Sequence, residues 1–249
     1  HLIDIITPDK FFSVAQYQKL ALPKINEIHQ KNKLPIIVGG TGQYIDAIVN
    51  PDKSTYSIKP NNFLRYFLNK LSTPTLQKIY KILDRKTFDS LNNSEKHNPH
   101  RLIRKIEIKL SRRDVACYVS TNRNNFDILH LSLTAPTSFL YPRIDSRVQK
   151  RLDLGLLTEI KKILKKYSWT DPGLNTLAYK EFHPYFVETH HDASLLKNCQ
   201  KKWSFDEHAY ARRQITWFKK QKNIIFIDIS QPGFHSKIYK QLNKWYNSL

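Results

Sequence analysis

The arrangement of apolar and polar residues predicts helices and strands in alternation over the first fifty residues. Ser13 is a favourable N-cap, and apolar residues then recur every three or four positions as far as Ile28, with Pro23 expected to kink this helix. Residues 34–38 form an apolar run rich in β-branched side chains, which is typical of a strand buried on both faces of a parallel sheet. A glycine-rich loop ends that run and a second helix is expected over 43–49. This order predicts an α/β architecture.

The composition changes after residue 50, where residues 51–96 predict an inserted all-helical subdomain. Turn-forming residues come first, and short helices rich in Lys, Asn and Leu follow, with Asn61 as the expected cap of the first. Pro99 is expected to open another helix at its first turn. Further on, the pattern predicts strands over 127–133 and 223–229, a loop containing Pro136 and Pro142, and helices over 143–160, 205–220 and 238–249.

The glycine loop has the chemistry of an anion site. Gly39, Gly40, Thr41 and Gly42 follow the predicted strand and lead directly into the next helix. Free backbone N–H groups and a helix N-terminus therefore converge near the hydroxyl of Thr41. The alternative is that the glycines only form a tight turn between strand and helix.

Two groups of cations favour contacts with phosphate. Arg143, Arg147 and Arg151 lie four residues apart on one helix stripe and repel each other unless an anion or an acidic side chain lies beside them. Arg101 and Arg104, with Lys105, project from the helix that Pro99 opens, which favours phosphate contacts over a merely solvated face. For an arginine such as Arg65, a solvated surface position remains the competing interpretation.

Composition favours a polyanionic partner. The 249 residues contain 41 Lys and Arg against 21 Asp and Glu, giving a formal charge of +20, so nucleic acid is the first expectation and an anionic membrane surface the second. No apolar run approaches the roughly 20 residues that span a bilayer, and no signal-peptide pattern occurs, which favours a cytoplasmic location. Cys117 and Cys199 are expected to be reduced and structural. His183, His190 and His191 lack the companions of a metal site and are expected in loops.

Several motifs together resemble the tRNA dimethylallyltransferase family. The residues His1-Leu-Ile-Asp4, Pro8 and Phe12-Ser13, followed by LPIIVGGTGQY at 34–44, keep the order and spacing of that family. Residues 143–160 resemble its RIxxRxxxMxxxGLxxEV motif, and ARRQITWFKK at 211–220 matches its motif closely. Looser matches cover its PNDxxRLxRALE segment at 97–108 and its IGYKE segment at 175–182. The resemblance spans nearly the whole chain and is weak across 51–96.

The chain departs from the family pattern at several positions. Arg151 replaces the usual methionine, and Asp206-Glu-His208 stands where Thr-Arg-Gln is commoner. Ala178 stands where glycine is usual, and its methyl group is expected to narrow the substrate channel. The sequence starts at His1, contains no methionine and has no G-x-x-x-x-G-K-[ST], so a fragment without the upstream phosphate loop of the family is expected.

The resemblance implies a P-loop NTPase-like parallel sheet flanked by helices, with an inserted all-helical subdomain. Residues 1–50 and 97–249 would form the catalytic core, and 51–96 an inserted tRNA-binding subdomain. The implied reaction moves a dimethylallyl group from dimethylallyl diphosphate to N6 of adenosine 37 in tRNAs that read codons beginning with U. The expected partners are the tRNA anticodon stem-loop and the diphosphate donor, without a membrane, and the expected state is a monomer.

The resemblance also implies roles for individual residues. Thr41 would bond the leaving oxygen and Arg147 would neutralise the diphosphate, both as catalytic residues. Mg²⁺ would be held mainly by the diphosphate and the missing segment, which would also supply an aspartate base. The remaining diphosphate-binding residues are Gly39, Gly40, Gly42 and Arg143, and the implied tRNA contacts are Thr41, Arg65, His100, Arg101, Leu102, Ile103, Arg104, Lys180, Arg212, Arg213 and Gln214.

Two other functions use the same features. A nucleotide or nucleoside kinase of related architecture would also use a glycine loop and an arginine-lined lid, and it would consume ATP without tRNA. A non-catalytic RNA-binding remnant would bind tRNA tightly and in a salt-sensitive manner, with no turnover when donor and Mg²⁺ are supplied.

Overall fold

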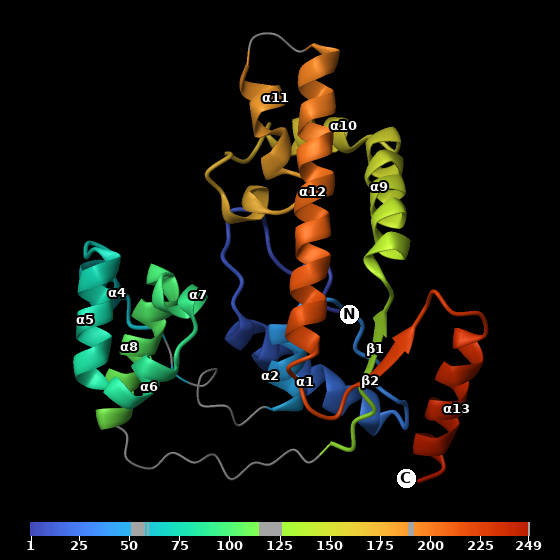
Figure 1. Cartoon of the computed structure of the whole chain (residues 1–249), viewed down its shortest axis with the longest axis horizontal. Coiled ribbons are helices and arrows are strands. Elements are labelled where there is room, and N and C mark those ends of the chain that lie inside the picture. Colours follow the sequence, from blue (N-terminus) through green and yellow to red (C-terminus); the bar gives the residue numbers. More distant parts are fainter. Residues whose placement is uncertain (51–57, 59, 115–125, 189–191, 249) are drawn as a thin grey trace. The chain divides into compact units, whose positions relative to one another are not determined.

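The chain folds into two compact units in a computed structural model that describes residues 1–50, 58, 60–188 and 192–248 (Figure 1). The first unit comprises residues 1–46 and 126–249, and the second comprises residues 47–125. The second unit is thus inserted into the sequence of the first.

The first unit is mostly helical. The N-terminal helix α1 (Val14–Gln30) begins as predicted, because Ser13 and Gln16 form a reciprocal capping box. Helix α2 (Gly42–Val49) follows the glycine loop. The other elements are β1 (Leu131–Thr134), α9 (Thr137–Asp153), α10 (Leu156–Ile163), η1 (Pro172–Asn175), η2 (Lys180–Phe182), α11 (His183–Val187), α12 (Ala193–Phe218), β2 (Ile225–Asp228) and α13 (Phe234–Tyr246).

The sheet of the first unit is small and parallel. Strand β1 pairs with β2 in a register that runs from Leu131 opposite Ile225 to Thr134 opposite Asp228. These are the only two strands in the described residues. Strand β2 lies within the predicted strand 223–229, and β1 overlaps the predicted strand 127–133 but ends one residue beyond it; both are shorter than predicted. The architecture is therefore helical with a small parallel sheet, consistent with the predicted α/β class.

The predicted strand at residues 34–38 is wrong. This segment has no regular secondary structure, and Ile36 and Val38 are 78% and 91% exposed. A strand needs a neighbouring strand to bond its N–H and C=O groups, and the part of the chain described here places none beside this segment. The apolar run alone could not reveal this, because it encodes burial and not the partner.

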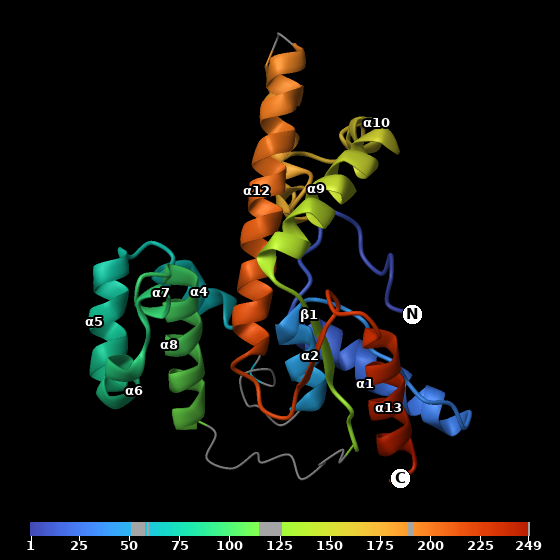
Figure 2. The ribbon, with the colours of Figure 1, turned by 45° about the vertical axis from the view of Figure 1, so that its right-hand side comes forward.

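The core of the first unit lies between α9 and α12, which pack side by side in both views (Figure 2). Trp203 of α12 and Phe182 of η2 are fully buried and meet edge to face, with ring centroids 5.9 Å apart. Val148 of α9 and Ile160 of α10 complete this cluster. The long helix α12 therefore packs against α9, η2 and α11 in this core.

The predicted helix 143–160 is two helices. Gly155 adopts a left-handed φ of +99° between α9 and α10, which glycine tolerates and which ends the first helix. The predicted core stripe is nevertheless buried on both sides of the break, at Ile144, Val148 and Ile160. The sequence places Pro142 in the loop before this helix, but in the structure Pro142 lies inside α9.

The described residues of the second unit form a helical bundle without strands. Its elements are α4 (Asn62–Leu68), α5 (Thr73–Leu83), α6 (Arg85–Ser90), α7 (Asn93–Lys96) and α8 (Pro99–Asp114). Asn61 caps α4 as predicted, since its side chain accepts from the N–H of Leu64. The unit extends beyond the expected range 51–96, because α8 buries Leu102 and Ile106 against Leu76 of α5. None of the helices in the described part of the chain is long and apolar enough to span a membrane.

Candidate functional site

The glycine loop leads into α2 as predicted. Thr41 is exposed and lies directly before the first residue of the helix, where its carbonyl accepts from the N–H of Tyr44 at 2.9 Å. The first N–H groups of an α-helix have no partner within the helix, so this end carries a partial positive charge. The hydroxyl of Thr41 and these amides can together bind an anionic oxygen.

The glycines are required by a close approach to α12 and not by an unusual turn. A Cβ on Gly40 would lie 2.1 Å from Nε2 of Gln214, and a Cβ on Gly42 would lie 2.2 Å from the indole of Trp217. Neither glycine has a positive φ. Gly39, in contrast, has open space around it. Two of the three glycines thus let the loop lie directly against α12.

Aromatic packing fixes the loop from its other side. Tyr44 stacks on Tyr17 of α1, with ring centroids 4.6 Å apart and an angle of 11° between the planes, and Phe12 meets Tyr44 edge to face. Burial raises the pKa of both Tyr17 and Tyr44. The aromatic residues on both sides of Ser13 therefore contact Tyr44, which follows the glycine loop.

The three arginines of α9 have three different partners. Arg147 donates from Nη2 to Oε2 of Glu207 at 3.0 Å, and the other oxygen of that buried carboxylate accepts from the indole N–H of Trp203 at 3.1 Å. Arg151 lies over the ring of Trp203, and Arg143 over that of Phe139. An acidic partner thus relieves the expected repulsion at Arg147, whose side chain still remains largely exposed.

Helix α12 brings the glycine loop and Arg147 onto one of its faces. Gln214 donates from Nε2 to the carbonyl of Gly40 at 2.9 Å, and Glu207 binds Arg147. Residues seven apart on a helix share a face and differ by about 10 Å along the axis. The two regions that were predicted to bind diphosphate are therefore held by a single rigid element.

A second contact between α9 and α12 lies beside Arg147. Tyr141 stacks on His208 with ring centroids 4.0 Å apart, and its hydroxyl accepts from Arg212. Nε2 of His208 lies 2.9 Å from a carboxylate oxygen of Asp145. Arg212 and Arg213 are both exposed as predicted, but Arg212 is already tied to α9. Gln214 donates to the carbonyl of Gly40 in the glycine loop, and its contact with tRNA stays a prediction.

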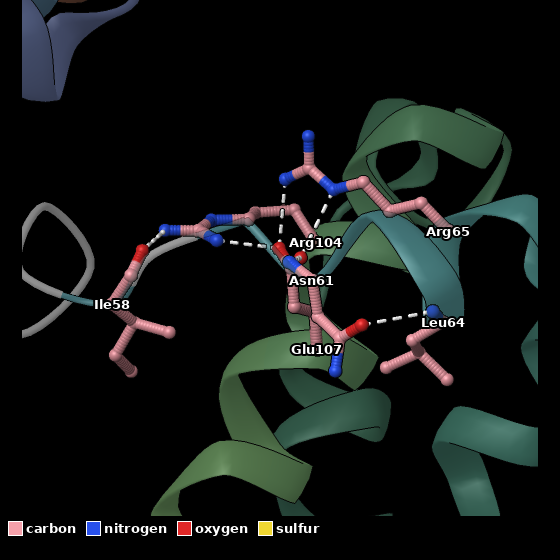
Figure 3. Close-up of polar contacts among 6 residues, drawn as sticks. All are labelled: Ile58, Asn61, Leu64, Arg65, Arg104 and Glu107. Atoms are coloured by element: carbon pink, nitrogen blue, oxygen red, sulfur yellow. Dashed lines mark hydrogen bonds and ion pairs between the residues drawn. The ribbon is translucent and has the colours of Figure 1, made fainter.

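In the second unit, one buried carboxylate forms ion pairs with two of the arginines predicted to bind tRNA (Figure 3). Glu107 of α8 is fully buried and accepts from Nε and Nη2 of Arg65 at 3.0 and 2.7 Å, from Nη1 of Arg104, and from the N–H of Asn61. Arg104 also donates to the carbonyl of Ile58 at 2.7 Å. Burial raises the pKa of Glu107, but the two guanidinium groups outweigh it and leave this pKa below its ordinary value. Their charge is thus partly balanced within the protein.

Of the other α8 residues predicted to contact tRNA, two are exposed and two are buried. His100 and Arg101 are exposed, and the side chain of Arg101 donates to the hydroxyl of Ser94 at 3.2 Å. Leu102 and Ile103, also predicted to contact tRNA, are buried in the core of the unit. That prediction is corrected for both side chains, because they face α5 while their charged neighbours face solvent.

Ala178 lies in the core of the first unit and not in a channel. It is fully buried, has a left-handed φ of +79°, and donates its N–H to Oε2 of Glu181 at 2.8 Å. The backbone conformation therefore accounts for the glycine that is usual here, which corrects the expectation of a narrowed channel. Lys180 is exposed, with Nζ 3.5 Å from Oε1 of Glu181. Tyr179 donates to Glu159 at 2.6 Å, and burial together with this bond raises the pKa of Tyr179 to about 12.

The described residues provide no cluster of three or more His, Cys, Asp or Glu side chains that would hold a metal ion. His190, His191 and Cys117 lie outside the described residues, and Cys199 is a buried free thiol.

Sequence reasoning missed the two acidic residues that organise these sites. Glu107 ends the PNDxxRLxRALE-like segment and follows Arg104 by three positions, the spacing of an ion pair on a helix. This spacing could have predicted the pairing of Glu107 with Arg104 from the sequence. Glu207 gave no comparable signal, because its partner Arg147 is 60 residues away in the sequence.

Comparison with known proteins gives one consistent result. Residues 1–221 match the family described as IPP transferase. A tRNA dimethylallyltransferase from Roseiflexus sp. strain RS-1 is 30% identical over 248 residues, which cover 98% of this chain and 80% of the relative. Another, from Halalkalibacterium halodurans, is 30% identical over 249 residues, which cover 96% and 76%.

Solved structures show the same likeness. The full-length tRNA isopentenylpyrophosphate transferase from Bacillus halodurans superposes with a TM-score of 0.64 at 27% identity, covering 99% of this chain and 79% of that one. A eukaryotic dimethylallyltransferase acting on tRNA superposes with a TM-score of 0.77 over the whole of this chain and 65% of its own, at 22% identity. The second likeness concerns the fold alone.

Proposed function

Because this chain belongs to the IPP transferase family, we propose that it is a prenyltransferase that moves a dimethylallyl group from dimethylallyl diphosphate to an adenosine of tRNA. The finer proposal is N6 of adenosine 37 in tRNAs that read codons beginning with U. The parallel pair of β1 and β2 with its flanking helices supports a P-loop NTPase-like sheet as the finer description of the fold.

The chemistry sets clear demands on the site. The neutral N6 amine forms a bond to the primary allylic carbon, the bond from that carbon to the diphosphate oxygen breaks with its electron pair staying on the diphosphate, and the N6 proton passes to a general base, for which the resemblance implies an aspartate. Negative charge develops on the departing diphosphate, so N–H donors and cations must be placed beside it. Water must be kept from the allylic carbon, since it would compete with the amine.

The observation that carries the proposal is that α12 holds both anion-binding regions. Gln214 places the loop that contains Thr41, and Glu207 places Arg147, on one face of the same helix. In the proposal the hydroxyl of Thr41 and the first amides of α2 bind the leaving oxygen. Arg147 neutralises the charge of the diphosphate, with the exposed Arg143 beside it.

The RNA contacts are proposed for cations that the protein leaves accessible. The target base must leave its stack to reach the donor, which favours binding at the anticodon stem-loop, where bases are unpaired. Arg65 and Arg104 act through their shared contact with Glu107, which fixes them next to α8. The protein is proposed to work as a cytoplasmic monomer. The exposed residues that carry the proposed RNA contacts are His100, Arg101, Lys180, Arg212 and Arg213.

The direct test is labelled transfer. The protein is incubated with an unmodified tRNA transcript, Mg²⁺ and radiolabelled dimethylallyl diphosphate, and the RNA is digested to nucleosides. We expect the label in an N6-prenylated adenosine. Arg147→Ala should lower turnover by a factor of a hundred or more, the effect of removing one charge-stabilising group, while tRNA affinity changes little.

Lys150→Ala provides the matched control, because it removes an exposed cation from the same helix without touching the Glu207 contact. Undiminished turnover in Arg147→Ala would refute the assigned role of that arginine. Consumption of ATP without incorporation into tRNA would indicate a kinase, and tight tRNA binding without any turnover would indicate a non-catalytic remnant. Either result would overturn the proposed function.

A further inference from the structure

Helix α4 carries three large aromatic side chains on its solvent face. Phe63 is 75% exposed, Tyr66 60% and Phe67 50%. The aliphatic residues of the same helix do the opposite, since Leu68 is buried and Leu64 packs against the core of the second unit. The core therefore accounts for the leucines of α4 but not for its aromatic residues.

These rings form one ordered surface, which we call the aromatic face: Phe63, Tyr66, Phe67 and Lys70. Their spacing places all four on one side of the helix and its continuation. Phe67 meets Phe63 edge to face, with centroids 4.9 Å apart at 71°, and meets Tyr66 at 5.4 Å and 84°. Nζ of Lys70 lies 4.1 Å from the centre of the Tyr66 ring and donates to its hydroxyl at 2.9 Å. The rings are thus held in place before any partner binds.

An exposed apolar surface of this kind marks an interaction site, because a protein gains nothing by leaving such rings in water. The charge next to the rings indicates the partner. Helix α4 has no acidic residue, its aromatic face carries the cation of Lys70, and the second unit as a whole contains more Lys and Arg than Asp and Glu. Rings combined with cations suit an anionic partner that has flat, unstacked groups.

We propose that the aromatic face of α4 stacks against unpaired bases of RNA. Stacking between aromatic side chains and bases is the usual way in which proteins bind single-stranded loops, and every base offers a π-face for it. Lys70 supplies a cation for the neighbouring phosphate. This inference rests on the proposed function, in which the substrate presents an unpaired loop. It adds a binding surface in the segment where the family resemblance is weak.

The test compares a hairpin RNA that has an unpaired loop with a fully paired duplex of the same length. The variant Phe63→Ala with Tyr66→Ala removes two exposed rings and no charge. We expect its affinity for the hairpin to fall by about 5- to 150-fold, the range for the loss of one stacked base. Its affinity for the duplex and the salt dependence of binding should stay as in the unaltered protein, because no cation is removed.

Two further variants make the result specific. Phe63→Tyr with Tyr66→Phe keeps both rings and should bind the hairpin with normal affinity. Tyr239→Ala removes a similarly exposed tyrosine from α13, outside the aromatic face, and should also bind normally. An unchanged hairpin affinity in the double alanine variant, or an equal loss for the duplex, would overturn the proposal.

Other occupants of this face predict different results. If another part of the chain covered it, the double alanine variant would lose thermal stability without RNA. If a second copy covered it, the unaltered protein would dimerise in sedimentation and the variant would not. Both results would replace the RNA proposal. RNA binding is measured without prenyl donor, so the two proposals can be tested separately. If the unaltered protein prenylates tRNA and the double alanine variant binds the hairpin with normal affinity, only this inference is refuted and not the proposed function.

Discussion

At the scale of single residues, the sequence indicated which positions matter more reliably than why they matter. Gly40 and Gly42 were predicted from their place before a helix, but the structure shows that they admit Gln214 and Trp217. Ala178 stands at a position that usually takes glycine, and the cause is a left-handed φ in the core. Such causes depend on side chains brought in from distant parts of the chain, which a local pattern does not encode.

Glu181 gives a prediction at this scale. Its carboxyl group is fully buried and Oε2 accepts from Ala178, whereas Oε1 accepts no hydrogen bond in the described structure and lies 3.5 Å from Nζ of Lys180. Burial is the main cause that raises the pKa of Glu181, and the neighbouring Asp206 adds to it, while Lys180 acts against it. The folded state therefore holds this proton more tightly than the unfolded state. Stability is lost as the pH rises from the unfolded value, near 4.5, through the folded one.

Glu181→Gln should remove that pH dependence, because the amide stays neutral and its oxygen still accepts from Ala178. We expect the variant to be more stable than the unaltered protein at pH 8 by about 1 kcal/mol, the scale of a buried polar group without a partner. The difference should shrink towards pH 4.5. Urea unfolding at both pH values measures it, with the exposed Glu188→Gln as control. A variant less stable at pH 8 would contradict the prediction.

At the scale of elements, helix starts were predicted more reliably than strands, because one of the three predicted strands, at residues 34–38, is absent from the structure. The caps at Ser13 and Asn61 and the opening proline of α8 mark helix starts that the structure confirms. A helix satisfies its hydrogen bonds internally, so its signal lies within its own residues. The run at 34–38 had the composition of a buried strand, but a strand also depends on a partner far away in the sequence.

Glu107 gives the prediction at this scale, because it joins the start of α4 to α8. Glu107→Ala would leave Arg65 and Arg104 facing each other without a counter-charge. Removing one partner of a buried ion pair costs about 3–5 kcal/mol, and since both guanidinium groups reach solvent we expect about 2 kcal/mol. Asp89→Ala breaks the exposed pair with Arg85 in the same unit and should cost about 0.5 kcal/mol or less. Equal losses in urea unfolding would show that Glu107 does not join these helices.

At the scale of the whole molecule, the charge of +20 was visible in the sequence, but its distribution was not. Arg101, Arg104 and Arg213 look equivalent as letters. In the structure Arg104 shares a buried carboxylate, whereas Arg101 bonds a neutral hydroxyl and Arg213 lies over the ring of Tyr210. Arg101 and Arg213 have no ion pair with a buried carboxylate in the described residues and therefore present more of their charge to a polyanion than Arg104 does. Net charge therefore predicts the class of partner, and the ion pairs decide which residues meet it.

This distinction predicts the salt dependence of tRNA binding. Each phosphate contact by an uncompensated cation adds about 0.7 to 0.9 to the slope of log affinity against log salt concentration. Arg101→Ala and Arg213→Ala should each lower the slope by about that amount, because each leaves one phosphate without its cation. Arg104→Ala should leave the slope nearly unchanged, even where it weakens binding by disturbing the contact with Glu107. Fluorescence anisotropy with one tRNA between 50 and 200 mM salt measures all three, with Lys240→Ala on α13 as a surface control. An equal fall in slope for Arg104→Ala and Arg101→Ala would show that tRNA displaces Glu107 from Arg104. It would refute the prediction that the ion pair with Glu107 keeps Arg104 from contributing to the salt dependence.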